Sequence, residues 1–359
     1  MIFDQTRLRK ALSWAKDLKD AAVHYKAKTQ SLKISAEHIQ LEIKDAGAIA
    51  AENDFAISDS MAKMIEVMEP GEITIEKDDK GTVIRKGKTR AKFLTPTIVQ
   101  RNLPGIKEGA TATVPGDVLY NLIDRVRYAV AIMDSRPALT GLRFCSTPQN
   151  AYMAEGLDGF QIARTETKES MHQGENMDMI LAMPAALKLL KLLDGENVTI
   201  RADKAQAEFS TENWTLLAAL IAAPPANTDQ IISATMSGEV VKFHSADLLG
   251  ALERAKIALN GDNQPVRIDI SSEAMRFSAN GQAFEFEDEA LEFGGNVPAD
   301  FGMRMAFKID YLRNMIVNAK CSTATLRISG EVRPVVITAE DSAMGILFTG
   351  VTLPVRAQG

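Results

Sequence analysis

The sequence contains little cysteine and little histidine, and their scarcity excludes several classes of protein. Its 359 residues include two cysteines, Cys145 and Cys321, too few for a disulfide framework or for a zinc site built from cysteine. The four histidines are scattered along the chain, with no pair at the spacing of metal ligands. We therefore expect no metal site, and no other cofactor is indicated, whereas a Ser-His-Asp or Cys-His catalytic arrangement stays open at this point.

Long hydrophobic runs are absent as well. The longest, Leu216 to Ala223, is far too short to cross a bilayer, and the first residues, MIFDQTRLRK, lack the basic-then-apolar pattern of a secretory signal. The composition, 46% apolar and 25% charged, is that of a globular protein. Without such a signal or a long apolar run, we expect a cytoplasmic location. A chain of this length is too long for one ordinary core, so we expect two or three domains.

A long internal repeat organises the chain. Stretches that share a helix end, a turn and a short strand recur at residues 68–78, 192–203 and 318–329. Each follows an amphipathic helical pattern, and a second predicted helix lies earlier in each unit, at residues 4–21, 116–130 and 245–259. Around them, runs such as VRIDISSEAMRFSAN predict strands. We therefore predict three copies of one α+β domain, at residues 1–110, 111–230 and 231–359, with joints near 104–113 and 224–237.

The placement of charge is more informative than its sum. The net charge of −6 argues weakly against a nucleic-acid partner. However, the polar positions of the predicted helices are mainly Lys and Arg, whereas the acidic excess lies elsewhere, as in EFEDEALE at 285–292. For any one helix, an ordinary solvated face is the simpler interpretation. Recurrence in all three units favours one positive side that holds a polyanion by its phosphates, without reading sequence.

Four stretches together resemble the bacterial DNA polymerase III beta subunit, the sliding clamp, over essentially the full length of the chain. VRYAVAIMDSRPALTGLRF (126–144) resembles the family's helix-to-loop segment, and GLDGFQIAR (156–164) resembles its Asp-Gly-His-Arg-Leu-Ala run. MPAALKLLKLLDGENVTIRAD (183–203) is similar to the second-domain helix and strand, and VTLPVR (351–356) to the apolar-Pro-apolar-Arg terminus. Their order and spacing, with the triple repeat, carry the resemblance.

The resemblance implies a fold class and a function. It implies a ring-shaped homodimer of α+β chains, each with three DNA-clamp domains, with helices lining the inside and antiparallel sheets outside. Duplex DNA threads such a ring, which acts as a processivity factor by tethering the replicative polymerase to its template. It is not an enzyme. Its other partners are a polymerase subunit and the clamp loader, which bind through short linear peptides.

In such clamps, a groove between the second and third domains receives these peptides. An apolar groove with a fixed proline can anchor an extended peptide through a few side chains. Phe160 and Gln161 stand where the family commonly has His and Arg, which leaves the partner preference open. The plain alternative for the tail is an edge strand. The matching positions are Leu139, Leu157, Gly159, Phe160, Gln161, Ile162, Ile231, Val351, Leu353, Pro354, Val355 and Arg356.

The resemblance also implies a seam between the first domain of one chain and the third domain of the other. The candidate edges are basic RKGKTRAKFL (85–94) and acidic FEFEDEALEF (284–293), whose opposite charges would set the register. Two unrelated surface strands are the plain alternative. The predicted seam residues are Lys88, Arg90, Phe93, Ile257, Leu259, Glu285, Glu287, Asp288 and Glu289. The predicted DNA contacts are Arg9, Lys10, Lys26, Lys28, Arg125, Arg136, Lys188 and Lys191.

Two other interpretations predict different assemblies. GTVIRKGKT (81–89) resembles a phosphate loop, but five residues separate its glycines where four are required, and a strand-like run follows in place of a helix. An uncharacterised multidomain enzyme would be a monomer with a substrate pocket. A DNA-binding scaffold without ring closure would share the basic helices but not the seam, and would sediment as one chain or an open series.

Overall fold

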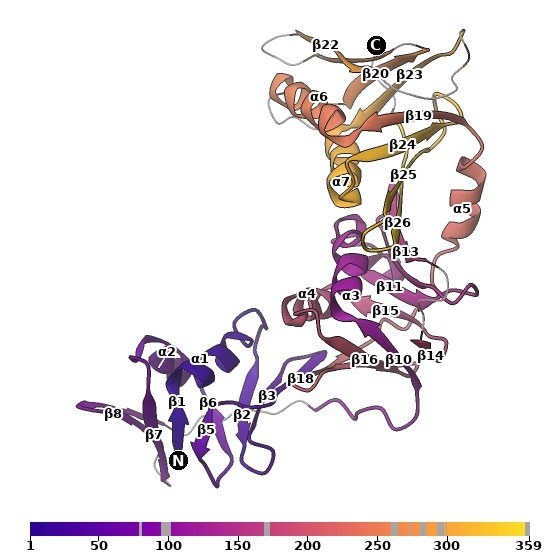
Figure 1. Cartoon of the computed structure of the whole chain (residues 1–359). Helices are drawn as coiled ribbons and strands as arrows, with labels where there is room; N and C mark the ends of the chain where they lie inside the picture. The colour runs from indigo at the N-terminus through magenta and orange to yellow at the C-terminus, as the bar shows by residue number, and fades with distance from the viewer. Residues whose placement is uncertain are drawn as a thin grey trace. The chain divides into compact units, whose positions relative to one another are not determined.

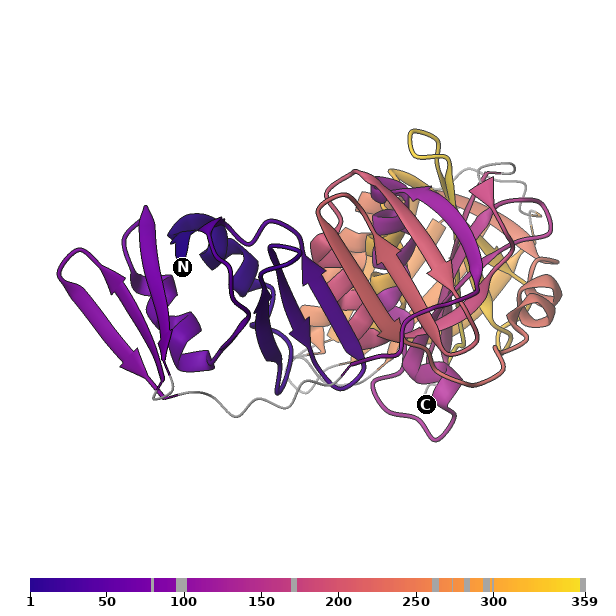
Figure 2. The same cartoon turned by 90° about the horizontal axis from the view of Figure 1, so that it is seen from below.

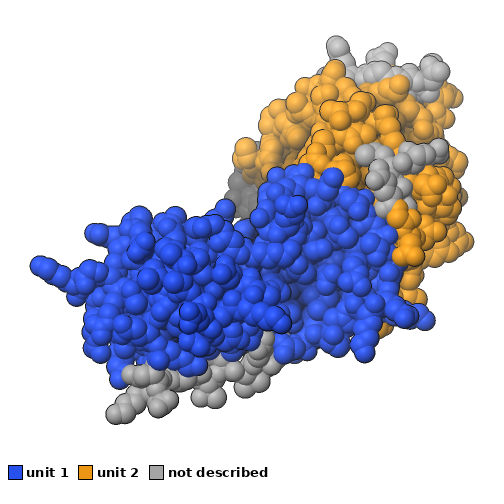
Figure 3. Space-filling view, turned by 60° about the horizontal axis from the view of Figure 1, so that its bottom comes forward, with its two compact units in different colours: residues 1–114, 191–220 blue, residues 115–190, 221–359 orange. Residues whose placement is uncertain are grey.

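The computed structural model describes residues 1–78, 81–94, 102–168, 173–259, 265–272, 274–280, 285–292, 298 and 300–355. They form two compact units, residues 1–114 with 191–220 and residues 115–190 with 221–359 (Figure 3). Seven α-helices and four sheets lie within this described part (Figure 1). None of those helices is long and apolar enough to cross a bilayer.

The first unit contains two short helices that lie side by side, α1 (Gln5–Ser13) and α2 (Asp59–Val67) (Figures 1 and 2). Each begins at a residue whose side chain accepts a bond from a free backbone N–H: Asp4 from Arg7 N at 2.8 Å, and Ser58 from Met61 N at 3.2 Å. An ion pair of 2.5 Å between Lys16 and Glu66 joins the two helical segments.

Two antiparallel arrays of strands complete the first unit. One sheet has the order β5 (Ala48–Ala50), β1 (Ile2–Asp4), β7 (Glu72–Asp78), β8 (Gly81–Lys86) and β9 (Thr89–Phe93), which makes β9 an edge strand. The other has the order β10 (Ala110–Pro115), β16 (Asn197–Ala202), β17 (Gln206–Ser210), β18 (Trp214–Ala219), β4 (Ile39–Ile43), β3 (Ser31–Ser35), β2 (Ala22–Lys26) and β6 (Phe55–Ile57).

The second unit is built on an eight-stranded sheet that takes in the end of the chain. Its order is β15 (Asp178–Ala182), β11 (Gly141–Ser146), β12 (Tyr152–Leu157), β13 (Gln161–Thr167), β26 (Ile346–Thr352), β25 (Val335–Asp341), β24 (Thr323–Ile328) and β19 (Glu239–His244). β26 pairs with β13 on one side and with β25 on the other. β26 is therefore an interior strand, which excludes the alternative of a plain edge strand for this segment.

Helices cover both faces of this sheet. On one face, α3 (Gly116–Asp124) and the 3₁₀ turn η1 (Arg127–Ala129) pack on β12 and β13, while α7 (Ile309–Ala319) packs on β25 and β26. The opposite face carries α5 (Thr228–Thr235). The remaining elements of this unit are η2 (Pro137–Thr140), β14 (Gln173–Gly174), α4 (Met183–Leu192) and α6 (Ser245–Ala258).

A second, four-stranded sheet lies further along the same unit. Its order is β22 (Glu285–Glu292), β21 (Ala274–Asn280), β20 (Pro265–Ser271) and β23 (Gly302–Lys308), so that β22 is an edge strand. The course of β22 is described, but its side chains are not. The acidic run that was predicted to be a strand is therefore a strand, and it lies at the edge of its sheet.

Three helix predictions differ from the structure. The helices expected over 4–21 and 116–130 end early, at Ser13 and Asp124. After Ser13 the chain continues in tight turns, because successive N–H groups bond to the carbonyl three residues back, as in Lys16 N to Ser13 O at 3.3 Å. Helix α5 was not predicted, and it occupies the segment that was expected to be a joint between domains.

Two glycines allow the helices on the first face to approach the sheet closely. A Cβ on Gly156 would lie 2.5 Å from the Val126 carbonyl oxygen, and a Cβ on Gly350 would lie 2.9 Å from the Met315 Cε. We expect Gly156→Ala to lower the free energy of unfolding by about 1–3 kcal/mol, because backbone must move. Gly350→Ala should cost clearly less, since the Met315 side chain can change rotamer. Urea denaturation of both variants tests this, and equal costs would contradict it.

Candidate functional site

A row of apolar side chains crosses four strands on the face that carries α5. Leu157 pairs with Ile162, Ile162 pairs with Val351, and Val351 pairs with Val336. Because side chains alternate between the faces of a sheet, residues paired in this way point to the same side. Ile162, Val336 and Val351 are buried, and Leu157 together with Ile232 of α5 packs against them. This row is the floor of the candidate groove.

Exposed apolar residues surround the floor. Phe160, Ile231 and Leu353 expose 62%, 44% and 40% of their surface. The last residues are held in place, because Leu353 N donates to the Phe160 carbonyl at 3.3 Å and Val355 N donates to the Ala306 carbonyl at 2.8 Å. A buried apolar floor with an exposed apolar rim is the arrangement that binds the apolar side chains of an extended peptide.

The turn between β12 and β13 fixes one end of the groove. Gly159 has a φ of +91°, a conformation that glycine adopts without strain. The Asp158 carboxylate accepts hydrogen bonds from Phe160 N at 2.8 Å, from Gln161 N at 2.9 Å and from Gln161 Nε2 at 2.9 Å. The Asp158 carboxylate thereby holds the backbone of the turn, and the Phe160 side chain is exposed to solvent on this turn.

Gln161 does not line the groove as predicted. It pairs with Thr352, one position along from the apolar row, so its side chain points to the opposite face. It is 5% exposed, and its amide donates to Asp158. Its role in the described structure is to hold the turn rather than to meet a ligand.

The other predicted groove positions are placed as follows. Leu139 in η2 is 3% exposed, so it does not line an open groove, and its backbone bonds with Arg136 and Ala131 close the loop between η1 and η2. Pro354 and Val355 are half-buried beside the rim. Arg356 lies outside the described residues. Val336 and Ile232 were missed, although the apolar run PVVIT and the Ile-Ile pair in α5 are the sequence features that could have indicated them.

A buried polar network holds α5 on the sheet. The Arg164 guanidinium donates to Glu155 Oε2 at 2.9 Å, to Thr228 Oγ1 at 2.7 Å and to Asp229 Oδ1 at 2.6 Å. Thr228 in turn donates to Glu155 Oε2 at 2.6 Å. Glu155, Arg164 and Thr228 are all buried. The first turn of α5 is thus fixed, and with it the position of Ile232 over the floor.

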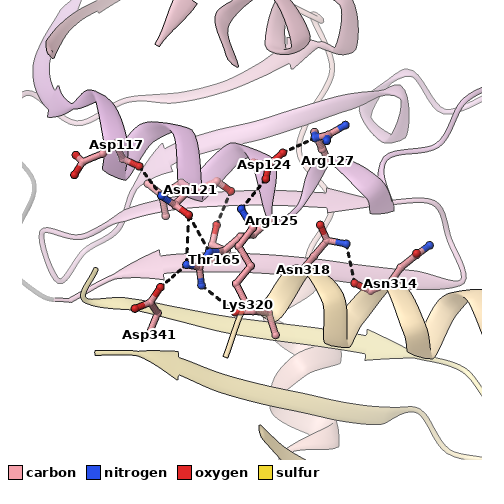
Figure 4. Close-up of polar contacts among 12 residues, drawn as sticks. Asp117, Asn121, Asp124, Arg125, Arg127, Thr165, Asn314, Asn318, Lys320 and Asp341 are labelled. Atoms are coloured by element: carbon pink, nitrogen blue, oxygen red, sulfur yellow. Dashed lines mark hydrogen bonds and ion pairs between the residues drawn. The ribbon is translucent and has the colours of Figure 1, made fainter. Parts of the chain in front are cut away.

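Arg125 was predicted to contact DNA, and the structure contradicts this. Its side chain is buried, 1% exposed, and points toward α7 and the end of β25 (Figure 4). It donates to the Ala319 carbonyl at 2.9 Å and forms an ion pair with Asp341. Beside it, Lys320 donates to Asp124 at 2.7 Å. Arg125 therefore joins α3 to the C-terminal end of α7, because a buried guanidinium needs partners for its donors.

Lys188 is a second correction of the same kind. It is 2% exposed in α4, whereas its neighbour Leu187 is 41% exposed. The helix is therefore turned so that the lysine, with Ala185 and Leu189, lies on the buried face. A buried lysine is not available to a phosphate on the protein surface.

The remaining predicted DNA contacts lie at the surface. Arg9, Lys10 and Lys28 are exposed and form no ion pair with any residue that the structure describes. Lys26 is paired with Asp54 at 3.1 Å, and Lys191 with Asp17 at 2.5 Å. The free cations are the ones best able to meet phosphates, because the paired ones must first give up their carboxylates.

Arg136 lies beside the groove. Its guanidinium donates to both carboxylate oxygens of Asp134, at 2.9 and 3.0 Å, and its Nη2 is 2.9 Å from where a Cβ on Gly159 would stand. The hydrogen bonds from the Arg136 side chain and backbone lower the pKa of Asp134 to about 2. This predicted DNA contact is therefore charge-paired and packed against the turn that carries Phe160.

The predicted seam residues divide into three groups. Arg90 is exposed on edge strand β9, Lys88 is exposed in the turn that precedes this strand, and Phe93 is half-buried at its end. Ile257 is 70% exposed on α6, but Leu259 is 2% exposed and belongs to the core, which corrects its prediction as an interface residue. The acidic residues lie on edge strand β22, and the structure describes their backbone but not their side chains. They are Glu285, Glu287, Asp288 and Glu289.

Comparisons with known proteins agree with this architecture. Residues 113–224 match a family model described as the central domain of the DNA polymerase III beta subunit. The beta sliding clamp of Bacillus subtilis is 24% identical over 260 residues, covering 71% of this chain and 67% of its own. That of Vibrio cholerae is 21% identical over 336 residues, covering 89% of both.

A solved structure extends the match to the whole chain. The DNA polymerase III subunit beta of Pseudomonas aeruginosa has a TM-score of 0.87 at 17% identity, with 99% of both chains covered. The α+β clamp fold predicted from the sequence is therefore confirmed.

Proposed function

We propose that this chain is a divergent member of the DNA polymerase III beta subunit family and acts as a DNA sliding clamp, which the match of its central part, the curated relatives and the shared fold support. Two chains would close into a ring around duplex DNA and tether a polymerase to its template, as a processivity factor without catalytic activity of its own. The tether raises the local concentration of the polymerase without tight contact to the bases. Its place of action would be the cytoplasm.

The observation that carries the proposal is the pair of free sheet edges. Edge strand β9 is basic, through Arg90 and Lys92 with Lys88 in the turn just before it, and edge strand β22 is an acidic run. Free edges present unpaired N–H and C=O groups and readily accept another strand. Opposite charge on the two edges favours pairing of β9 in one chain with β22 in the other, and disfavours the pairing of either edge with its own copy.

We propose further that each chain consists of the three clamp domains 1–110, 111–230 and 231–359. The match of residues 113–224 to a central domain supports the two inner boundaries. In this arrangement the second and third domains share the eight-stranded sheet through the pairing of β13 with β26. The two domains are then joined by a continuous sheet, and α5 packs across this junction. Because the sheet is continuous, a groove at the junction keeps its shape.

The groove would bind short linear peptides from a polymerase subunit and a clamp loader. Support comes from the apolar floor of Leu157, Ile162 and Val351 and from the exposed rim of Phe160 and Leu353. The apolar tail that follows β26 is thus a wall of the groove. Phe160 replaces a basic position of the family with an apolar one, so we expect a partner peptide with more apolar character there.

Contact with DNA would be electrostatic and weak. Arg9, Lys10 and Lys28 are the predicted contacts without an ion pair among the described residues, with the charge-paired Lys26 and Lys191 as secondary ones. A few phosphate contacts give sequence-independent binding that falls steeply as salt rises. This is the behaviour that a ring needs if it is to slide.

The seam is tested by charge reversal. We expect the chain to sediment at about twice its 39.1 kDa, and Lys88→Glu with Arg90→Glu to raise the dimer dissociation constant at least tenfold. Adding Glu287→Lys and Asp288→Lys to the same chain should restore the dimer, because opposite charges again face each other. An unchanged dimer in the first variant would place the seam elsewhere. A monomer or an open series in the natural chain would favour a DNA-binding scaffold without ring closure.

A further inference from the structure

The two most exposed large apolar side chains of the described structure are neighbours on one loop. Ile132 and Met133, between η1 and η2, are 102% and 89% exposed. Single exposed apolar residues are ordinary on protein surfaces. Two consecutive ones on one loop are different, because they hold the surface of two large apolar side chains in water, and exposed apolar surface of this kind commonly serves binding.

Hydrogen bonds at the base of the loop and within it fix its conformation, and with it the position of the tip. At its base, Ala131 N donates to the Leu139 carbonyl at 2.9 Å. Within it, Asp134 accepts three bonds from Arg136, one from the backbone N at 2.8 Å and two from the guanidinium. A preformed loop binds at a lower cost in conformational entropy than a flexible one.

The loop adjoins the candidate groove. Arg136 packs against Gly159, and the next residue, Phe160, is the most exposed apolar residue of the groove rim. Leu353 in turn donates its backbone N–H to the Phe160 carbonyl at 3.3 Å. These contacts place Arg136, which follows the tip on the same loop, against the turn at 158–161 that carries the rim residue Phe160.

The chemistry of the tip favours an apolar partner over a phosphate. The only charges on this loop, Asp134 and Arg136, are bonded to each other and cancel. The tip therefore offers apolar surface and no net charge, whereas a phosphate contact requires a free cation.

We propose that Ile132 and Met133 form a second docking point for the partner peptide, which takes an apolar side chain flanking the segment held in the groove. The inference rests on the proposed function of the groove and adds a determinant of specificity to it. A flanking segment of three extended residues spans about 10 Å.

A set of labelled peptides tests the inference on the full chain. The core probe is Gln-Leu-Ser-Leu-Phe, extended at either end through two glycines by a leucine or, as the matched control, by a serine. At one end, the leucine extension should bind the natural chain about fivefold more tightly than the serine extension. The gain should vanish in Ile132→Ser with Met133→Ser and persist in Ile132→Val with Met133→Leu. The affinity of the core probe should be the same in all three chains.

The outcomes separate the loop from the groove. If the core probe binds but neither extension gives a gain, or the gain persists in the serine variant, the loop inference is wrong and the groove stands. If the core probe does not bind the natural chain, the groove is wrong and the loop inference falls with it. If the serine variant changes only salt-dependent retention on duplex DNA, the loop is a nucleic-acid contact and the proposal is overturned.

Discussion

Replacing Arg125 with methionine is expected to lower the free energy of unfolding by about 3–5 kcal/mol, the cost of breaking a buried ion pair from one side. Arg125 is 1% exposed, and its loss removes the guanidinium donor from the Ala319 carbonyl and the charged partner from the Asp341 carboxylate. Methionine keeps most of the volume, so the loss measures the polar contacts rather than a cavity. Urea denaturation followed by circular dichroism gives the value.

The same variant should change how stability depends on pH. Burial raises the pKa of Asp341, but hydrogen bonds from Arg125 and from the Met344 and Ala343 backbone outweigh it and hold the pKa below its ordinary value of 3.8. A lowered pKa contributes stability that is present above 3.8 and is lost as the pH falls through the lowered value. In Arg125→Met this acid-side loss should shrink, because the strongest side-chain donor is gone.

Lys320 supplies the matched control. It is paired with Asp124 at 2.7 Å in the same cluster, but its side chain is 35% exposed. Lys320→Met should therefore cost only about 0–1 kcal/mol, as exposed pairs usually do. Equal losses from the two methionine variants would mean that burial of Arg125 does not decide its contribution, and that its assignment as a link between α3 and α7 is wrong.

A chain that ends at Thr352 is expected to lose at least tenfold in affinity for the Gln-Leu-Ser-Leu-Phe probe while remaining folded. The truncation leaves β26 complete but removes Leu353, Pro354 and Val355, the wall of the groove. Loss of one apolar contact of leucine size is worth about 1.5–3 kcal/mol, and tenfold in affinity corresponds to about 1.4 kcal/mol. Fluorescence anisotropy measures the binding.

Two further chain ends bracket this result. A chain that ends at Arg356 keeps the wall and should bind like the full chain. A chain that ends at Gly350 lacks Val351 and Thr352, which pair with strands on both sides, and should be strongly destabilised. If the chain that ends at Thr352 binds the probe as well as the full chain does, the groove has been put in the wrong place.

Many of the groove residues could be predicted because they lie in short stretches whose apolar pattern is visible in the sequence. Ile162, Val351 and Leu353 are apolar residues beside a turn and beside a proline, in stretches that resemble a family. The structure adds what brings them together, namely the pairing of Ile162 with Val351 across 189 positions of the chain. The unpredicted α5 has eight residues, too short to be stable alone, and it depends on Glu155 and Arg164 from two distant strands, β12 and β13.

The errors have a common physical cause. Arg125 and Lys188 were assigned to the surface as charged residues of predicted helices, and Leu259 was assigned to the apolar part of the seam. Charge is tolerated in the interior where a partner exists, and the partner of Arg125 is Asp341, 216 positions away. Helical spacing gives a stripe but not which side of it meets the sheet, so Leu187 is exposed and Lys188 is buried.

The central claim is that two chains enclose DNA, and topology tests it most directly. Dilute chains concentrated in the presence of a nicked circular duplex would assemble around it, and seam crosslinking would then fix the ring. After a wash in 1 M salt, which abolishes electrostatic binding, the chain should stay with the circle and be released when the circle is cut. Equal loss from circular and linear DNA, or equal retention on both, would contradict the clamp.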